Sequence, residues 1–274
     1  MGVGGASMSN ITTRTLLEMK EKGERIVALT CYDALFARLL DASGVDVLLV
    51  GDSLNQVLAG ASSTLSATLE QMIYHTTMVR RGTERALVVC DMPFLSYQIS
   101  PGEAIRNCGR AMKESGCHAV KIEGGQPIAA TVRRLVDIGI PVMGHIGLTP
   151  QSVHALGGYR VQGRDDATAE RLKADAAALQ DAGAFGVVLE LVPAPLASLI
   201  TKALTIPTIG IGAGPACDGQ VLVLHDMLGL NDQFSAKFVK QYAALAEDVR
   251  EAARVFAAEV REGRYPGPEH SFGK

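Results

Sequence analysis

Short runs of aliphatic residues recur along the chain and alternate with longer segments of helical periodicity. Most runs are apolar at consecutive positions instead of alternate ones, which is typical of strands buried on both faces of a parallel sheet. The pattern predicts eight strands, over Ile26–Leu29, Val45–Val50, Ala86–Cys90, Ala119–Ile122, Pro141–Met143, Gly186–Leu189, Thr208–Ile211 and Val221–Leu224.

The segments between the runs carry helix signals. Ser100-Pro101-Gly102-Glu103 combines an N-cap, a first-turn proline and a capping-box glutamate, so it predicts a helix over residues 101–115. Apolar residues recur at helical spacing in the other segments. They predict helices over residues 13–22, 69–81, 167–182 and 235–263.

Strand and helix alternate eight times with no linker or break in composition, which predicts a single (β/α)8 barrel, a TIM barrel of the α/β class. An open doubly wound sheet is the main alternative, and the count of eight favours the closed barrel. The segment 13–22 is then an extra N-terminal helix that covers the bottom of the barrel. We expect residues 1–11, rich in Gly and Ser, to be flexible, and residues 12–274 to form one domain that ends in C-terminal helices.

Composition narrows the classes of function. The 26 basic and 29 acidic residues are scattered, so the net charge of −3 gives no basic surface for nucleic acid or an anionic membrane. No apolar stretch is long enough to span a bilayer, and the first residues lack the apolar core of a signal peptide. Five cysteines without C-x-x-C spacing favour buried, reduced thiols. These features predict a cytoplasmic protein that acts on small molecules.

Acidic residues follow or end three neighbouring predicted strands. In a barrel these strand ends face the active site, so Asp52, Asp91 and Glu123 would place three carboxylates at one rim. Such a cluster repels itself unless a cation neutralises it, and Mg²⁺ prefers oxygen ligands of this kind. The alternative is that each carboxylate caps a helix or pairs with a surface cation. Three such residues on adjacent strands favour the metal site.

Other polar residues of the same rim suit anion binding and proton transfer. Lys121 lies two positions before Glu123, so both side chains point into the barrel mouth. A charged Lys121 can hold a substrate carboxylate, whereas a Schiff base needs a neutral amine, which nearby carboxylates oppose. Glu190 ends an apolar run on the far side of the barrel, where a lone carboxylate suits a general base. His145 is a candidate substrate contact or a structural histidine.

An ordered set of short motifs resembles one family, the ketopantoate hydroxymethyltransferases (3-methyl-2-oxobutanoate hydroxymethyltransferases), from about Thr12 to Phe272. Each motif is weak alone, but the set is specific. The motifs are Val50-Gly51-Asp52-Ser53, Asp91-Met92-Pro93-Phe94, Val120-Lys121-Ile122-Glu123-Gly124-Gly125, Gly144-His145-Ile146-Gly147-Leu148-Thr149-Pro150-Gln151-Ser152, Gly157-Gly158-Tyr159-Arg160-Val161-Gln162-Gly163-Arg164, Leu189-Glu190, Ile209-Gly210-Ile211-Gly212-Ala213-Gly214 and Tyr265-Pro266-Gly267.

The resemblance implies a Mg²⁺-dependent barrel enzyme of pantothenate biosynthesis. Such an enzyme moves a hydroxymethyl group from its co-substrate 5,10-methylenetetrahydrofolate to 3-methyl-2-oxobutanoate, giving 2-dehydropantoate through a Mg-stabilised enolate. The family pattern assigns the metal to Asp52 and Asp91, which also contact the oxo acid, with Glu123 nearby and acting through water. Family members form homo-oligomers, commonly decamers built from dimers.

The resemblance also implies roles for the other site residues. Ser53 and Lys121 match residues that bind the oxo acid, His145 matches a histidine that contacts the substrate, and Glu190 matches the proposed base. The chain departs from the family pattern at Asn55-Gln56 and Ala61, on the loop after the second strand. These departures leave the metal residues intact and bear on the shape of the pocket on that side.

Two other functions remain open at this point. A lyase of the isocitrate-lyase and phosphoenolpyruvate-mutase type would also hold a Mg²⁺-bound enolate at a barrel mouth, but the catalytic cysteine loop of such enzymes is not evident here. A ring-forming scaffold without activity would keep only the barrel. The intact residues Asp52, Asp91, Lys121 and Glu190 argue against a scaffold.

Overall fold

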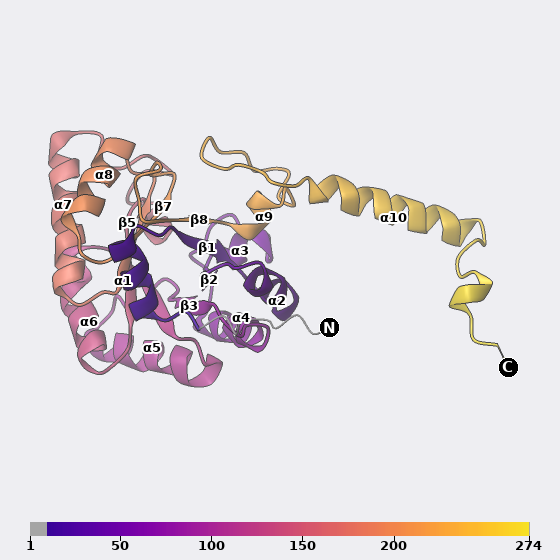
Figure 1. Cartoon of the computed structure of the whole chain (residues 1–274), viewed down its shortest axis with the longest axis horizontal. Helices are drawn as coiled ribbons and strands as arrows, with labels where there is room; N and C mark the ends of the chain where they lie inside the picture. Colours follow the sequence, from indigo (N-terminus) through magenta and orange to yellow (C-terminus); the bar gives the residue numbers. More distant parts are fainter. Residues whose placement is uncertain (1–9, 274) are drawn as a thin grey trace. The chain divides into compact units, whose positions relative to one another are not determined.

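The computed structural model describes residues 10–273. Its eight strands are all parallel and form a closed barrel, in which each strand pairs with its neighbours in the chain and β8 pairs with β1. Helices lie around the outside of the strands (Figure 1). The predicted TIM barrel is therefore confirmed. The strands are β1 (Ile26–Thr30), β2 (Val47–Val50), β3 (Leu87–Asp91), β4 (Ala119–Glu123), β5 (Val142–Gly147), β6 (Gly186–Glu190), β7 (Thr208–Ile211) and β8 (Gly219–Leu222).

The helices begin where the sequence supplies caps. The side chain of Thr68 accepts a hydrogen bond from the backbone N–H of Gln71, and that of Ser100 accepts one from Glu103, which confirms the helices predicted after these residues. The helices of the barrel unit are α1 (Thr13–Lys22), α2 (Ala34–Ala42), α3 (Leu54–Val57), α4 (Leu69–Arg81), α5 (Pro101–Ser115), α6 (Gln126–Asp137), the 3₁₀ turn η1 (Pro150–Ser152), α7 (Asp166–Asp181) and α8 (Ala194–Ala203).

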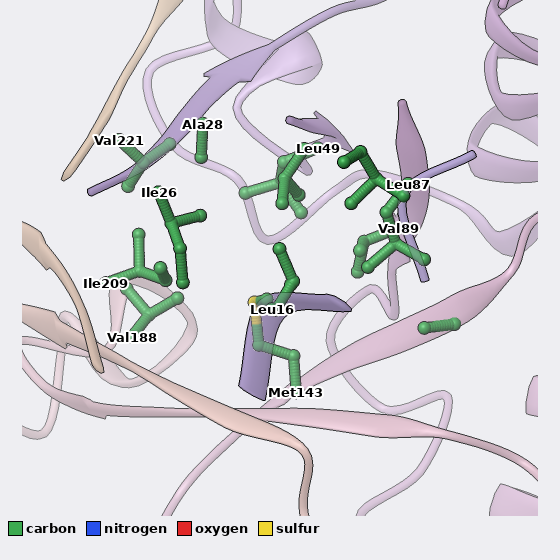
Figure 2. Close-up of a cluster of buried hydrophobic side chains, with 13 residues drawn as sticks. Leu16, Ile26, Ala28, Leu49, Leu87, Val89, Met143, Val188, Ile209 and Val221 are labelled. Carbon is green, nitrogen blue, oxygen red and sulfur yellow. The ribbon is translucent and has the colours of Figure 1, made fainter. Parts of the chain in front are cut away.

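Helix α1 covers the amino-terminal end of the barrel. Leu16 of this helix is buried among side chains that come from the strands, including Ile26, Val89 and Val221 (Figure 2). Burying one such leucine contributes roughly 1.5–3 kcal/mol. Ile11 joins the same cluster, and its N–H donates to the carbonyl oxygen of Arg85 at 2.8 Å. Of the segment expected to be flexible, residues 1–9 lie outside the described part of the chain.

Strand β8 begins two residues before its predicted start, and the predicted range Val221–Leu224 is wrong at both ends. Gly219 starts the strand because β8 passes very close to β1: a Cβ atom at this position would lie 2.5 Å from the carbonyl oxygen of Ile26. Gly219 and Gln220 are not apolar residues of the kind that predict a buried strand, so the apolar pattern does not include them in β8. Leu224 instead begins helix α9.

The chain divides into two compact units, residues up to 223 and residues from 224 onward. The expected single domain over 12–274 stays a prediction. The second unit contains α9 (Leu224–Met227), α10 (Leu245–Arg261) and the turn η2 (Pro268–His270). The helix predicted over 235–263 is wrong in its first ten residues, because the N–H groups of Tyr242 and Leu245 donate to the carbonyls of Met227 and Leu228 instead of to a preceding helical turn.

All five cysteines are buried and free of disulfide bonds, as predicted. Between residues 10 and 273, no helix has both the length and the apolar character that crossing a membrane requires.

Candidate active site

The residues predicted for the site meet at one rim of the barrel, where the carboxyl ends of the parallel strands lie. The strand register brings Lys121 opposite Asp91 and His145 opposite Glu123. Asp91, Glu123 and Glu190 are the last residues of β3, β4 and β6, whereas His145 lies inside β5, which is longer than predicted. Asp52 and Ser53 follow β2.

Lys121 is buried among acidic side chains. Its Nζ atom lies 2.8 Å from Asp91 Oδ1 and 3.7 Å from Glu123 Oε1. Burial alone would lower the pKa of Lys121, but the carboxylates of Asp91, Glu123 and Asp52 outweigh burial and raise it. Lys121 is therefore a cation in the folded chain. This supports the charged anchor predicted from the sequence and opposes a Schiff base, which needs a neutral amine.

Asp52, Asp91 and Glu123 lie around the single ammonium group of Lys121, so their negative charges would exceed its positive charge if all three were ionised. Burial raises the pKa of Asp52 well above its usual value, and the charges of Asp91 and Glu123 raise it further. Burial also raises the pKa of Asp91, although Lys121 opposes the change. Buried carboxylates of this kind stay ionised only when a further cation or donors offset their mutual repulsion.

His145 connects the carboxylate cluster with the predicted base. Its Nε2 atom lies 3.2 Å from Glu190 Oε2, and its Nδ1 atom lies 3.4 Å from Glu123 Oε1 and 3.1 Å from Lys121 Nζ. Burial and the charge of Lys121 lower the pKa of His145, but the contacts with Glu123 and Glu190 raise it to about 9. The raised pKa favours a proton on Nε2, which faces Glu190. Glu190 is consequently not the lone carboxylate that the sequence predicted, because His145 is its partner.

Ser53 is held by a tyrosine that sequence reasoning missed. The hydroxyl of Tyr32, a residue that is 1% exposed, lies 2.9 Å from Ser53 Oγ. Gly51 makes room for this arrangement, since a Cβ atom there would lie 2.8 Å from Ser53 Oγ. Tyr32 follows β1 and carries no charge, so a search for acidic strand ends does not find it.

Gln151 and Tyr97 form a second group that the sequence left without a role. Gln151 Nε2 donates to Asp52 Oδ2 at 3.0 Å and to the carbonyl oxygen of Met92 at 2.9 Å. Its backbone N–H donates to Glu123 Oε2 at 3.0 Å. The Tyr97 hydroxyl lies 2.8 Å from Gln151 Oε1 and accepts a hydrogen bond from the backbone N–H of Glu123 at 3.0 Å. Gln151 lies within a quoted family motif, which was the available signal, whereas Tyr97 lies beyond the motif that ends at Phe94.

The departures from the family pattern lie between β2 and α4, with Asn55 and Gln56 in helix α3 and Ala61 in the loop that follows it. Asn55 is buried, and its Nδ2 atom donates to the carbonyl oxygen of Ser63 and to Ser66 Oγ, each at 2.8 Å. Gln56 Nε2 lies 3.4 Å from the hydroxyl of Tyr159. Asn55 therefore fixes the shape of this loop, and Gln56 connects it to the loop after β5.

The acidic cluster fits a hard divalent cation. Asp91 Oδ1 and Glu123 Oε1 are buried and have no hydrogen bond, although both lie near Lys121 Nζ. Among residues 10–273, however, no group of three or more His, Cys, Asp or Glu side chains is arranged to hold a metal ion. Mg²⁺ commonly uses one or two carboxylates and completes its shell with water and substrate oxygens. The donor set therefore fits Mg²⁺ better through Asp52 and Asp91 than through all three carboxylates.

A sequence profile of the ketopantoate hydroxymethyltransferase family matches residues 10–268. A protein of Moorella thermoacetica named 3-methyl-2-oxobutanoate hydroxymethyltransferase is 57% identical over 267 residues, which cover 97% of this chain and 99% of that protein. A protein of the same name from Pelodictyon phaeoclathratiforme is 54% identical over 268 residues, which cover 96% and 97%.

Solved structures with the same barrel are more distant in sequence. A 2,3-dimethylmalate lyase of the PEP mutase/isocitrate lyase superfamily has a TM-score of 0.59 and 19% identity, covering 94% of this chain and 92% of that one. A phosphonopyruvate hydrolase in complex with oxalate and Mg²⁺ has a TM-score of 0.61 and 11% identity, covering 94% and 93%. These likenesses concern the fold alone. The profile match and the relatives above 50% identity show that the chain belongs to the ketopantoate hydroxymethyltransferase family.

Proposed function

We propose that this chain is a 3-methyl-2-oxobutanoate hydroxymethyltransferase, which transfers a hydroxymethyl group from 5,10-methylenetetrahydrofolate to 3-methyl-2-oxobutanoate and gives 2-dehydropantoate. The observation that carries the proposal is the position of Glu190 Oε2, 3.2 Å from His145 Nε2, at the same rim as the Asp52, Asp91 and Lys121 cluster. This arrangement combines an anion anchor, oxygen ligands for a cation and a base in one site.

The oxo acid would be held by its carboxylate and ketone oxygens. Lys121 supplies a buried ammonium for an anionic substrate oxygen, and Ser53 supplies a hydroxyl that Tyr32 keeps in place at 2.9 Å. Asp52 and Asp91 would bind Mg²⁺, with Glu123 acting through water. When bound, Mg²⁺ would act as a Lewis acid toward the substrate oxygens.

Glu190 would remove the proton from C3 of the oxo acid. His145 Nε2, 3.2 Å from Glu190 Oε2, would orient the carboxylate before the transfer. The proton passes to a Glu190 carboxylate oxygen, and the electron pair of the C3–H bond becomes the nucleophile that attacks the methylene carbon. Both carbon–nitrogen bonds of the methylene group break, and one water supplies the oxygen of the new hydroxyl group. The proton held by Glu190 and one proton of that water go to the two folate nitrogens, which gives tetrahydrofolate. A positioned general base of this kind contributes about 10²- to 10⁴-fold in rate.

The test is product formation by the purified full-length chain. Mass spectrometry should detect 2-dehydropantoate when the chain is mixed with MgCl₂, 3-methyl-2-oxobutanoate and 5,10-methylenetetrahydrofolate, and EDTA should stop its formation. Leaving out the folate is the control that separates a transferase from a lyase, since the transferase then forms no product. Cleavage of the oxo acid without folate, or no 2-dehydropantoate in the complete mixture, would contradict the proposal.

A further inference from the structure

Gln151 joins three strand ends of the site, two through its side chain and one through its backbone N–H. This residue is 5% exposed and lies in the turn η1 after β5. Its amide reaches Asp52 beyond β2 and the carbonyl of Met92 beyond β3, while its backbone N–H reaches the carboxylate of Glu123 at the end of β4. Gln151, which follows β5, therefore connects Asp52 after β2 with Glu123 at the end of β4. These two strands lie on either side of β3.

The orientation of the Gln151 amide follows from its partners. The carbonyl oxygen of Met92 can only accept, so the amide nitrogen must face it, 2.9 Å away. The amide oxygen then faces the hydroxyl of Tyr97 at 2.8 Å and Gln98 Nε2 at 3.1 Å, both of which can donate. A flipped amide would set oxygen against oxygen on one side and nitrogen against nitrogen on the other. The amide thus has one arrangement, with a fixed N–H group aimed at Asp52.

We propose that Gln151 is a positioning residue for the metal site, whose amide fixes Asp52 Oδ2 and thereby sets the orientation of that carboxylate for a divalent cation. The inference depends on the proposed metal site. Asp52 is buried, and the like charges of Asp91 and Glu123 repel its carboxylate. An N–H donor 3.0 Å from one oxygen holds the carboxylate in place before the cation arrives.

A merely structural role for Gln151 makes a different prediction. A buried amide that only satisfies its hydrogen bonds stabilises the fold, and its loss lowers the free energy of unfolding without changing how the folded chain binds an ion. A positioning role changes the affinity for the ion itself. Replacing a residue that orients a metal ligand typically weakens metal binding by about 10- to 100-fold.

The experiment measures Mg²⁺ binding by isothermal titration calorimetry, with MgCl₂ as the probe and EDTA-stripped full-length chain without substrates. Gln151→Met keeps the length of the side chain, removes its amide and leaves the backbone bond to Glu123 in place. We expect its Kd for Mg²⁺ to rise by about 10- to 100-fold. Gln180→Met is the matched control, because the Gln180 amide also bonds to the backbone, at Thr205 and Ile206 before β7, and its Kd should stay within about twofold of wild type.

A second variant keeps the test decisive if Gln151→Met does not fold. Tyr97→Phe removes the hydroxyl that orders Gln151 Oε1 and leaves the amide present, so Mg²⁺ binding should weaken, but less than in Gln151→Met. Wild-type affinity in whichever of these variants folds would overturn the inference. If Asp91→Ala then still weakens Mg²⁺ binding, only the role of Gln151 fails. If the wild-type chain binds no Mg²⁺, the proposed metal site fails as well.

Discussion

Replacing Lys121 by methionine removes the one ammonium group that lies between the carboxylates of the site. Its Nζ atom is 2.8 Å from Asp91 Oδ1, and both side chains are buried. With an effective dielectric constant of about 20, Coulomb's law gives roughly 6 kcal/mol of attraction at that distance. Part of this attraction offsets the desolvation of the two ions. Removing one partner of a buried pair typically lowers the free energy of unfolding by about 3–5 kcal/mol, because the other charge stays buried without compensation.

Added Mg²⁺ should recover part of this loss in Lys121→Met. A cation at Asp52 and Asp91 would take over the role of the missing ammonium, and it would no longer be repelled by Lys121. A ligand at one hundred times its Kd stabilises the folded state by about 2.7 kcal/mol. We therefore expect Mg²⁺ to stabilise Lys121→Met more than it stabilises the wild-type chain.

The assay is urea denaturation at pH 8, in EDTA and in MgCl₂. Lys20→Met is the matched control, since Lys20 Nζ also lies 2.8 Å from a carboxylate, Asp218 Oδ2, but at the opposite end of the barrel. Lys20→Met should lose stability equally in both buffers. The reasoning is refuted if Lys121→Met unfolds at the wild-type urea midpoint in EDTA, or if Mg²⁺ stabilises the Lys20 variant as much as the Lys121 variant.

Three further outcomes follow from the site. Burial and the acidic neighbours raise the pKa of Asp52 above its unfolded value of about 3.9. The folded chain therefore favours the protonated carboxyl group. Its contribution to the free energy of unfolding is fully present below a pH of about 3.9 and is lost as the pH rises through the folded pKa. Asp52→Asn should therefore stabilise the metal-free chain more at pH 8 than at pH 5 in urea denaturation, and the reverse order would contradict this. Asp91→Ala should weaken Mg²⁺ binding with the fold intact, and calorimetry that finds unchanged affinity would remove Asp91 from the ligand set. Gly147→Ala should lower the free energy of unfolding by on the order of 2–4 kcal/mol, because φ is +95° there and a Cβ atom would collide with the carbonyl oxygen of Glu190; a wild-type urea midpoint would contradict this.

The barrel could be predicted from the sequence because its strands are buried on both faces and are therefore apolar at consecutive positions. The exception, β8, contains Gly219 and Gln220. Gly219 is required because β8 passes close to Ile26 of β1. This approach arises when the barrel closes, so the residues around Gly219 in the sequence do not indicate it. The first ten residues of the helix expected over 235–263 are not helical for a similar reason, since the backbone before α10 bonds to residues near α9.

The acidic part of the site could also be predicted, because a carboxylate at a strand end departs visibly from the apolar run before it. Tyr32, Tyr97 and Gln151 are uncharged, so the search for acidic strand ends does not find them. The family motif that contains Gln151 is a signal of resemblance and says nothing about its role. The partners of these residues are distant in the chain: Gln151 and Asp52 are 99 positions apart. The pairing of Glu190 with His145 depends likewise on how β5 and β6 align.

The central claim is that Glu190 takes the C3 proton of an oxo acid held at this rim. Proton NMR can follow the exchange of that hydrogen of 3-methyl-2-oxobutanoate into D₂O, with Mg²⁺ present and folate absent. The wild-type chain should catalyse the exchange, and Glu190→Gln should slow it by about 10²-fold or more. Exchange at the wild-type rate in Glu190→Gln would show that another group is the base and would contradict the account.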